Sequence, residues 1–206
     1  ERVISQLEKA GFKVSHDSDE AADIAVVNTC GFIGDAKEES IDTIMSLVAA
    51  KANGKVKKIY VMGCLSERYR EELRTEIPEV DGFYGKFDWN TLAADLSLSN
   101  LPLAGFDRTI TTPPHYTYIK ISEGCNRRCA FCAIPLITGT HKSRPIEEIE
   151  AEVMMLVGRG VKEFNIIAQD LSAYGLDLDG RQQRLAELVE RLSRIDGVKW
   201  LRLHYA

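Results

Sequence analysis

No stretch of this 206-residue sequence is apolar over the ~18–20 residues that a membrane-spanning helix needs, so the composition excludes a protein of that kind. Positive charge is not in excess, because the net charge is −5, and no overall basic field would attract nucleic acid. The opening residues have the pattern of an amphipathic helix and not of a signal peptide. Five cysteines without a disulfide framework are typical of the reducing cytoplasm, where we expect the protein to lie.

A fourth cysteine is missing from the most distinctive motif of the chain. Cys125, Cys129 and Cys132 stand in the segment C-N-R-R-C-A-F-C, with three residues in the first gap and two in the second. Thiolates this close can ligate three irons of a 4Fe–4S cube, whose irons normally bind cysteine sulfur. The remaining iron would be open to a small molecule, which favours a catalytic site over a pure electron carrier.

Two plainer interpretations of these cysteines stay open, namely a structural zinc site and thiols without a ligand. Zinc usually takes four ligands from paired C-x-x-C arrangements. His141 is the nearest candidate for a fourth ligand, but it lies too far beyond Cys132 to match those patterns. The spacing therefore favours an iron–sulfur cluster over zinc.

The first part of the chain alternates between helical and strand patterns. Ile41, Ile44, Met45 and Val48 should share one buried helix face, and Ser66 should cap a later helix. Repetition of this kind predicts a parallel sheet with helices on both faces. The expected elements are a helix ending at Gly11, a strand over 24–28, a helix over 35–51, a strand over 58–62, a helix over 66–76 and a short helix near 89–97.

Residues 98–115 contain three prolines and no clear period, which predicts a linker. A second α/β series follows it, with a helix that opens near Pro145. Three strands cannot close an α/β barrel, so we expect a fragment whose first domain, 1–97, also lacks its first strand. The expected elements of the second series are strands over 116–122, 163–168 and 198–204 and helices from Pro145 and over 184–195.

Cys30 and Cys64 each follow the C-terminal end of a predicted strand, about one strand–helix–strand repeat apart. Such ends lie on one edge of a parallel sheet, where α/β domains place ligands, so two soft ligands should converge there. Gly31 and Gly63 would let the backbone approach a bulky cofactor. Two ordinary buried cysteines are an equally acceptable interpretation.

Taken together, these motifs resemble the methylthiotransferases, a family of radical S-adenosylmethionine (SAM) enzymes. The resemblance implies an N-terminal α/β domain over 1–97 and the first part of a radical SAM barrel over 116–206, with more barrel and a TRAM domain to follow in the parent protein. It covers essentially the whole chain. The matching segments are 28–40, 61–69, 120–135, 141–145 and 168–175.

The resemblance also implies two 4Fe–4S clusters in the full-length protein. Cys125, Cys129 and Cys132 would hold the cluster that binds SAM. Cys30 and Cys64 would be the second and third ligands of an auxiliary cluster whose first cysteine lies upstream of Glu1. One SAM would donate a methyl group to sulfur at the auxiliary cluster, and a second would be cleaved to a radical that removes hydrogen from the substrate carbon.

Two segments, M-G-C-L-S-E-R-Y and C-A-I-P, are closer to the branch of the family that modifies a ribosomal protein than to the branch that modifies tRNA. The expected reaction adds a methylthio group to the β-carbon of an aspartate in the S-twelve protein of the small ribosomal subunit. It requires an electron donor and a sulfur source, and nucleic acid is not expected as the substrate. The alternatives are a tRNA adenosine methylthiotransferase and a non-catalytic iron–sulfur or metal-binding module.

Residues that contact SAM are predicted beside the motif, and no catalytic residue is assigned beyond the cluster ligands. Phe131 matches the family's aromatic position beside the adenine. Gln169 and Asp170 end the second barrel strand, where barrel enzymes place functional groups. Ser143 and Arg144 could hold the SAM carboxylate or the substrate. The alternatives are a turn or capping role for Asp170 and a solvated turn for Ser143 and Arg144.

Overall fold

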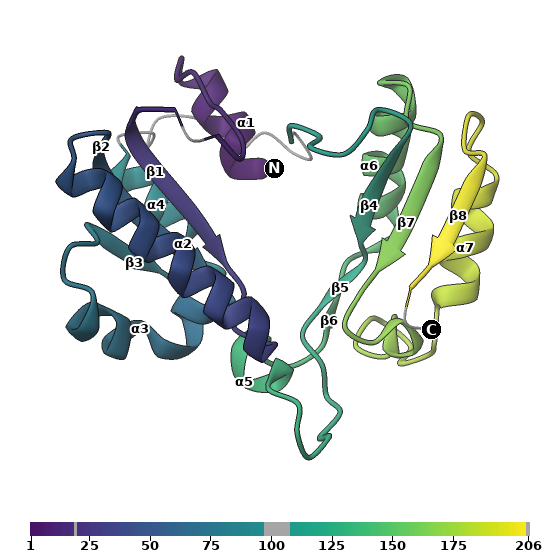
Figure 1. The fold of residues 1–206 in the computed structure, drawn as a ribbon. Coiled ribbons are helices and arrows are strands. Elements are labelled where there is room, and N and C mark those ends of the chain that lie inside the picture. Colours follow the sequence, from purple (N-terminus) through teal and green to yellow (C-terminus); the bar gives the residue numbers. More distant parts are fainter. Residues whose placement is uncertain (19, 97–107, 205–206) are drawn as a thin grey trace. The chain divides into compact units, whose positions relative to one another are not determined.

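The computed structural model of the protein describes residues 1–18, 20–96 and 108–204. The chain forms two compact units, Glu1–Arg108 and Thr109–Ala206 (Figure 1). Most of the predicted linker, 98–115, falls outside the described residues, and the part from 108 to 115 contains neither helix nor strand. Within the described ranges, no helix combines the length and apolar character that crossing a membrane requires.

The first unit contains a three-stranded parallel sheet in the order β1-β2-β3. Its strands are β1 (Ala22–Thr29), β2 (Val56–Gly63) and β3 (Gly82–Tyr84). The apolar runs I-A-V-V and I-Y-V-M form the middles of β1 and β2, as buried parallel strands require. In the register of the first pair, Thr29 lies opposite Gly63, so both strands end at the same edge of the sheet.

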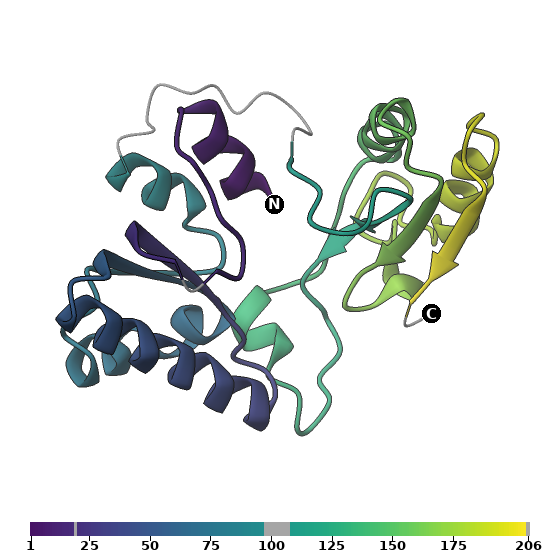
Figure 2. The same ribbon diagram turned by 45° about the horizontal axis from the view of Figure 1, so that its top comes forward.

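Helices cover both faces of this sheet, as predicted (Figure 2). One core, which includes Ile44, Leu65 and Leu73, packs the second and third helices against one face. The other core packs Leu7 and Leu92, from the first and fourth helices, near Tyr60 of β2. The four helices are α1 (Arg2–Lys9), α2 (Gly34–Ala52), α3 (Cys64–Glu76) and α4 (Trp89–Asp95).

Two details predicted for these helices are wrong. Met45 is 48% exposed, because it lies about 100° around the helix from the fully buried Ile44, whereas Ile41 and Val48 pack against the core. Ser66 does not cap α3, because the helix already begins at Cys64. Its buried hydroxyl instead donates a hydrogen bond to the carbonyl of Tyr84, 2.6 Å away, and ties α3 to β3.

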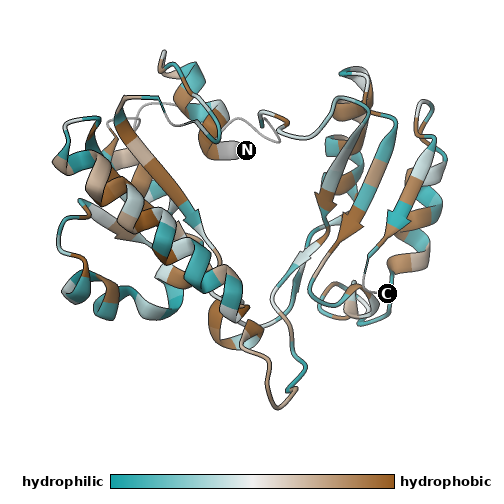
Figure 3. Ribbon diagram, viewed as in Figure 1, coloured by the Kyte–Doolittle hydropathy of each residue, from teal (hydrophilic) through white to brown (hydrophobic). Residues whose placement is uncertain are grey.

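The second unit has its own parallel sheet, in the order β4-β7-β8. Residues Ile119, Phe164 and Ile166 of this sheet are fully buried in one core with residues of α6 and α7. Figure 3 shows hydrophobic and hydrophilic residues alternating along β7, and a largely hydrophilic α3 in the first unit. The elements are β4 (Tyr116–Lys120), α6 (Ile146–Gly158), β7 (Glu163–Ile167), α7 (Leu185–Ser193) and β8 (Trp200–Leu203).

Short elements interrupt the segment between β4 and α6. The strand predicted over 116–122 ends at Lys120, and a separate strand β5 (Ser122–Glu123) pairs antiparallel with β6 (Lys142–Ser143). Between these two strands lies the short helix α5 (Ile134–Thr138). The segment therefore forms a hairpin whose long connection carries the three clustered cysteines.

Candidate metal centres

Cys30 and Cys64 lie at one edge of the first sheet, as their positions after predicted strands indicated. Each directly follows one of the paired residues Thr29 and Gly63, with which β1 and β2 end. Both cysteines are half-buried. Because neighbouring parallel strands end together, the two soft donors share the edge where α/β sheets place ligands.

Two glycines allow the segments around these cysteines to pack in direct contact. A Cβ on Gly31 would lie 2.6 Å from the carbonyl oxygen of Cys64. Gly63 has a φ of +111°, and a Cβ there would lie 2.5 Å from the carbonyl oxygen of Thr29. Both distances are too short for any side chain. The glycines thus permit a close approach of backbone. The backbone that approaches is that of Cys64 at Gly31 and that of Thr29 at Gly63.

Ser40 of α2 holds the backbone of Cys30. The amide of Cys30 donates to Ser40 Oγ at 3.0 Å, and the Ser40 hydroxyl donates to the carbonyl of Ala36 at 2.7 Å. The Thr29 hydroxyl also donates to the carbonyl of Met62 across the strand pair, at 2.8 Å. These bonds fix the Cys30 backbone, so the position of its thiol depends on a rigid edge and not on a mobile loop.

The second unit closes the base of the loop that bears Cys125, Cys129 and Cys132. The Cys125 amide donates to the carbonyl of Gly139 at 3.2 Å. The two ends of the loop also cross without space for a side chain, because Gly124 has a φ of +77° and a Cβ there would lie 2.1 Å from the Thr140 carbonyl. The β5–β6 hairpin therefore clamps the loop immediately before its first cysteine.

The tip of this loop is less constrained than its base. Residues 124–133 contain no helix or strand, and the amide of Cys132 donates to the carbonyl of Cys129 in a turn. Cys125 is buried, whereas Cys129 is exposed. In the part of the chain that the structure describes, no three His, Cys, Asp or Glu side chains stand in a metal-binding arrangement. The donor set still fits a cluster that gathers its ligands as it assembles, because three thiols share one loop without helix or strand.

Arg127 connects the cysteine loop to the end of β7. Its backbone amide donates to Cys125 Sγ at 3.4 Å, and its guanidinium donates to Asp170 and to the Ser172 hydroxyl, the latter at 3.0 Å. The hydrogen bond from Arg127 lowers the pKa of Asp170 against the opposing effect of burial. Asp170 also raises the pKa of Arg127, as do the nearby thiols of Cys125 and Cys129. A paired cation therefore lies beside the clustered cysteines.

A cavity of about 330 Å³ adjoins this ion pair. Its walls include Asn126 and Arg127 of the cysteine loop, His141, and Asp170 and Asp177 from the segment that follows β7. The cavity is therefore next to the cluster loop and carries both signs of charge. Of the residues predicted to contact SAM, Asp170 lines it, whereas its described walls include neither Gln169 nor Arg144.

Ser143 lies in a buried polar network, so the alternative of a solvated turn is wrong. Its hydroxyl donates to Asp177 Oδ1 at 2.6 Å and its amide to Oδ2 at 2.7 Å. His141 Nε2 lies 3.1 Å from the same hydroxyl, and the Gly175 amide donates to it at 3.0 Å. Burial opposes ionisation of Asp177, but the two Ser143 donors lower its pKa overall.

Gln169 and Arg144 are each engaged with other side chains of the second unit. Gln169 donates to Glu123 Oε1 at 2.6 Å. Arg144 donates to the carbonyl of Lys120 at 2.8 Å, and it lies 2.7 Å from the buried Glu152 as an ion pair without hydrogen-bond alignment. Phe131 differs from both, because its side chain is 96% exposed on the loop tip.

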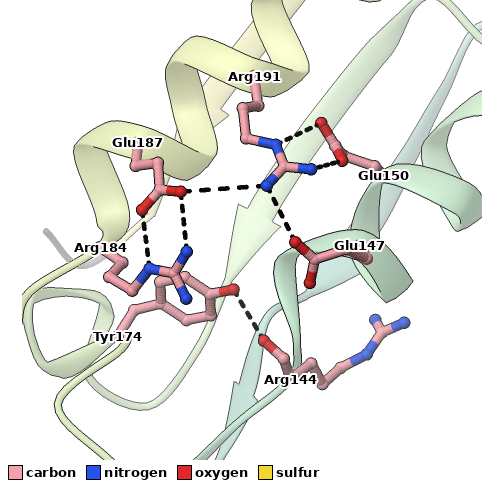
Figure 4. A network of polar contacts seen from close by, with 7 residues as sticks. All are labelled: Arg144, Glu147, Glu150, Tyr174, Arg184, Glu187 and Arg191. Atoms are coloured by element: carbon pink, nitrogen blue, oxygen red, sulfur yellow. Dashed lines mark hydrogen bonds and ion pairs between the residues drawn. The ribbon is translucent and has the colours of Figure 1, made fainter. Parts of the chain in front are cut away.

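Buried side chains and a hydrogen bond support the segment that follows β7. Leu171 and Tyr174 are fully buried, and the Tyr174 hydroxyl donates to the carbonyl of Arg144 at 2.8 Å. Figure 4 shows this contact beside an ion-pair network in which Arg191 of α7 contacts Glu147 and Glu150 of α6. Asp170 therefore projects from a fixed support, which sequence reasoning did not anticipate.

Two family profiles match separate parts of the chain. Residues 1–85 match "Uncharacterized protein family UPF0004", and residues 119–204 match "Radical SAM superfamily". The first range contains Cys30 and Cys64, and the second contains the three clustered cysteines.

Proteins called "Ribosomal protein uS12 methylthiotransferase RimO" are similar along the whole chain. The protein from Phocaeicola vulgatus is 60% identical over 207 residues, which cover 100% of this chain and 48% of the relative. Those from Bacteroides fragilis and Porphyromonas gingivalis are each 58% identical with the same coverage of both chains. The chain thus spans about half the length of the curated relatives it matches.

Proposed function

This chain belongs to the methylthiotransferase family of radical SAM proteins, and from that premise we propose that it forms part of an enzyme acting on a ribosomal protein. The reaction would add a methylthio group to the β-carbon of an aspartate in the S-twelve protein of the small ribosomal subunit. The observation that carries this proposal is the 60% identity, along the whole chain, to a relative named for ribosomal protein methylthiotransfer.

The radical site of this proposal is the loop that carries Cys125, Cys129 and Cys132. A 4Fe–4S cluster bound there with SAM would supply a carbon radical able to remove hydrogen from an unactivated C–H bond. The clamped loop base would fix Cys125, while the pliable tip lets the other two thiols reach the irons. The family uses SAM and an iron–sulfur cluster; the presence of two clusters is part of the proposal.

We further propose how the predicted SAM-contacting residues act. Phe131 can place its ring on the adenine, because it directly precedes the proposed ligand Cys132 and its ring is exposed. Asp170 lines the cavity beside the loop. Gln169 and Arg144 would act through their partners, because Glu123 and Glu152 already engage their polar groups.

Cys30 and Cys64 are proposed as two ligands of the auxiliary cluster. Their support is the contact between Gly31 and the Cys64 backbone, which places both cysteines at one edge. The family pattern supplies a third cysteine outside this sequence. Separate centres suit the chemistry, because radical formation and sulfur delivery are different tasks. The proposed setting is the cytoplasm, with an electron donor and a sulfur source as further partners.

The test uses the full-length protein, reconstituted without oxygen with iron and sulfide. It receives SAM and a reductant, together with either the S-twelve protein or unmodified tRNA, and mass spectrometry follows the methylthio group. We expect a modified aspartate, and no product from the matched Cys129→Ser variant. A modified adenosine would instead assign the protein to the tRNA branch.

Metal analysis of the same preparation tests the non-catalytic alternative. Iron with equimolar inorganic sulfide is the result expected from the proposal. Stoichiometric zinc without sulfide would contradict it, because zinc supports a structural site and cannot supply the electron.

A further inference from the structure

The ion pair between Arg127 and Asp170 joins two parts of the second unit that differ in burial. Asp170 follows β7 on a segment whose next residue, Leu171, is fully buried. Its own side chain is 10% exposed, and Ser172 donates a second hydrogen bond to it at 2.6 Å. Arg127 lies on the cysteine loop, and its side chain is 64% exposed. The fixed partner is therefore Asp170, and the partner being held is Arg127.

Arg127 is also placed where its position affects the cysteine loop. It lies between Cys125 and Cys129, and its amide donates to the Cys125 sulfur. Two of its guanidinium nitrogens contact Asp170 and a third contact reaches Ser172, so the fork is held in one orientation. Fixing the Arg127 side chain therefore also restrains the backbone that carries the thiols of Cys125 and Cys129.

We propose that Asp170 is a positioning residue for the radical cluster, which acts through Arg127 by holding the cysteine loop at the end of β7 and balancing the positive charge beside the cluster. The proposal rests on the proposed function, because it requires a cluster on Cys125, Cys129 and Cys132. This role takes the place of the turn or capping role considered for Asp170 from the sequence. The Asp170 side chain makes no capping hydrogen bond to the short helix that it precedes.

The charge of the pair gives the proposal a measurable consequence. Iron–sulfur reduction potentials depend on net charge near the cluster and on hydrogen bonds to its sulfurs. Loss of the Asp170 charge leaves the cation of Arg127 unbalanced and should make the cluster easier to reduce. Loss of the Arg127 charge leaves the carboxylate and should make reduction harder. An ion pair without influence on the cluster would leave both variants at the parent potential.

A second ion pair, between strands β7 and β8, provides the matched control. Glu163 is the first residue of β7, whereas Asp170 follows the end of that strand, and its partner Arg202 lies on β8; the side chains of Arg202 and Glu163 are 53% and 21% exposed. The variant Glu163→Gln removes a carboxylate charge paired with an exposed arginine, as Asp170→Asn does, but far along the strand from the cysteine loop.

The experiment measures the midpoint potential of the cluster by dithionite titration followed by electron paramagnetic resonance. All proteins carry Cys30→Ala and Cys64→Ala, so that a single cluster gives the signal. The variants are Asp170→Asn, Arg127→Gln and the control Glu163→Gln. Circular dichroism and iron content confirm that each variant is folded and loaded. If Asp170→Asn does not fold, the exposed Arg127 still allows the test through Arg127→Gln.

We expect a shift to more positive potential in Asp170→Asn, a shift to more negative potential in Arg127→Gln, and the parent value in Glu163→Gln. Shifts of the same sign in the first two variants, or values equal to the control, would overturn the proposal. If only Arg127→Gln folds, the parent potential in that variant overturns it. Failure of the parent protein to bind any cluster would instead count against the proposed function.

Discussion

Gly31 packs directly against the backbone of Cys64, the first residue of α3. We predict that Gly31→Ala lowers the free energy of unfolding by about 1–3 kcal/mol, because its Cβ would meet the Cys64 carbonyl oxygen at 2.6 Å and force the two segments apart. Urea denaturation measures the change. Gly34→Ala is the control, since a Cβ there meets nothing within 4 Å, and its stability should be unchanged or slightly higher.

Asp81 links the last turn of α2 to the start of β3. Burial opposes its ionisation, but hydrogen bonds from Lys51 Nζ, at 2.5 Å, and from the Ile59 amide, at 2.8 Å, hold its pKa below the ordinary 3.8. A carboxyl with a lowered folded pKa stabilises the fold above its unfolded pKa, and this stabilisation disappears as the pH falls through the folded value.

We therefore predict that Asp81→Asn melts at a lower temperature than the parent at pH 6. As the pH falls below 3.8 and through the lower folded pKa, the two melting temperatures should converge, because the parent carboxyl then becomes protonated as well. Thermal melts from pH 6 to pH 3 check this. A difference that stays constant over the whole range would show that the Asp81 charge contributes nothing.

At the scale of single residues, the places of the cysteines at a sheet edge and in a loop could be predicted, and side-chain partners that depend on folding could not. The cysteine positions followed from motif and strand ends. The partner of Arg127 did not, because Asp170 lies 43 residues further along the chain, after β7, and nothing in C-N-R-R-C indicates which arginine turns toward it. The same reason concealed Asp177, whose role depends on the buried position of Ser143.

The Ser66 hydroxyl forms a buried hydrogen bond between helix α3 and strand β3. We predict that Ser66→Ala lowers the free energy of unfolding by about 1–3 kcal/mol, because it leaves the buried Tyr84 carbonyl without this donor. Thr75→Ala on the same helix is the control: its hydroxyl is exposed and bonds only back to Glu71, so a change within about 0.5 kcal/mol is expected. Equal losses in both variants would rule out a special role for Ser66.

Among elements, length decided what could be predicted. Helix α2 and strands β1 and β2 have enough residues for a hydrophobic period to be recognised. Strand β3 has three residues, and β5 and β6 have two each, which are too few for any period. The hairpin that clamps the cysteine loop was therefore invisible in the sequence, although the loop itself was its clearest feature.

Each unit of the molecule has a core of its own. We predict that Ile44→Ala destabilises the first unit by about 2–5 kcal/mol, because the side chain is fully buried. Hydrogen exchange should accelerate in β1 and β2 and stay unchanged in β4 and β7. The neighbouring Met45→Ala, at an exposed position, should leave both units unaffected. Equal acceleration in both sheets would mean that the units unfold together.

For the whole molecule, the fold class was predictable because the chain contains two separate series in which strand and helix patterns alternate. The parallel sheets and their helices confirm it. The position of the domain boundary stays a prediction. Which side of each sheet receives which helix could not be derived, since it depends on packing between residues far apart in sequence, such as Leu7 and Leu92.

The crossing of the chain at Gly124 and Thr140 also bears on how a cofactor would be assembled. Bringing the ends of a flexible loop together carries an entropic cost. Here the β5–β6 hairpin already holds these ends together in the folded protein. An incoming cluster would only need to order the tip between Cys125 and Cys132. Loading should therefore be a local event that follows folding, and a protein isolated without iron should need no refolding to accept it.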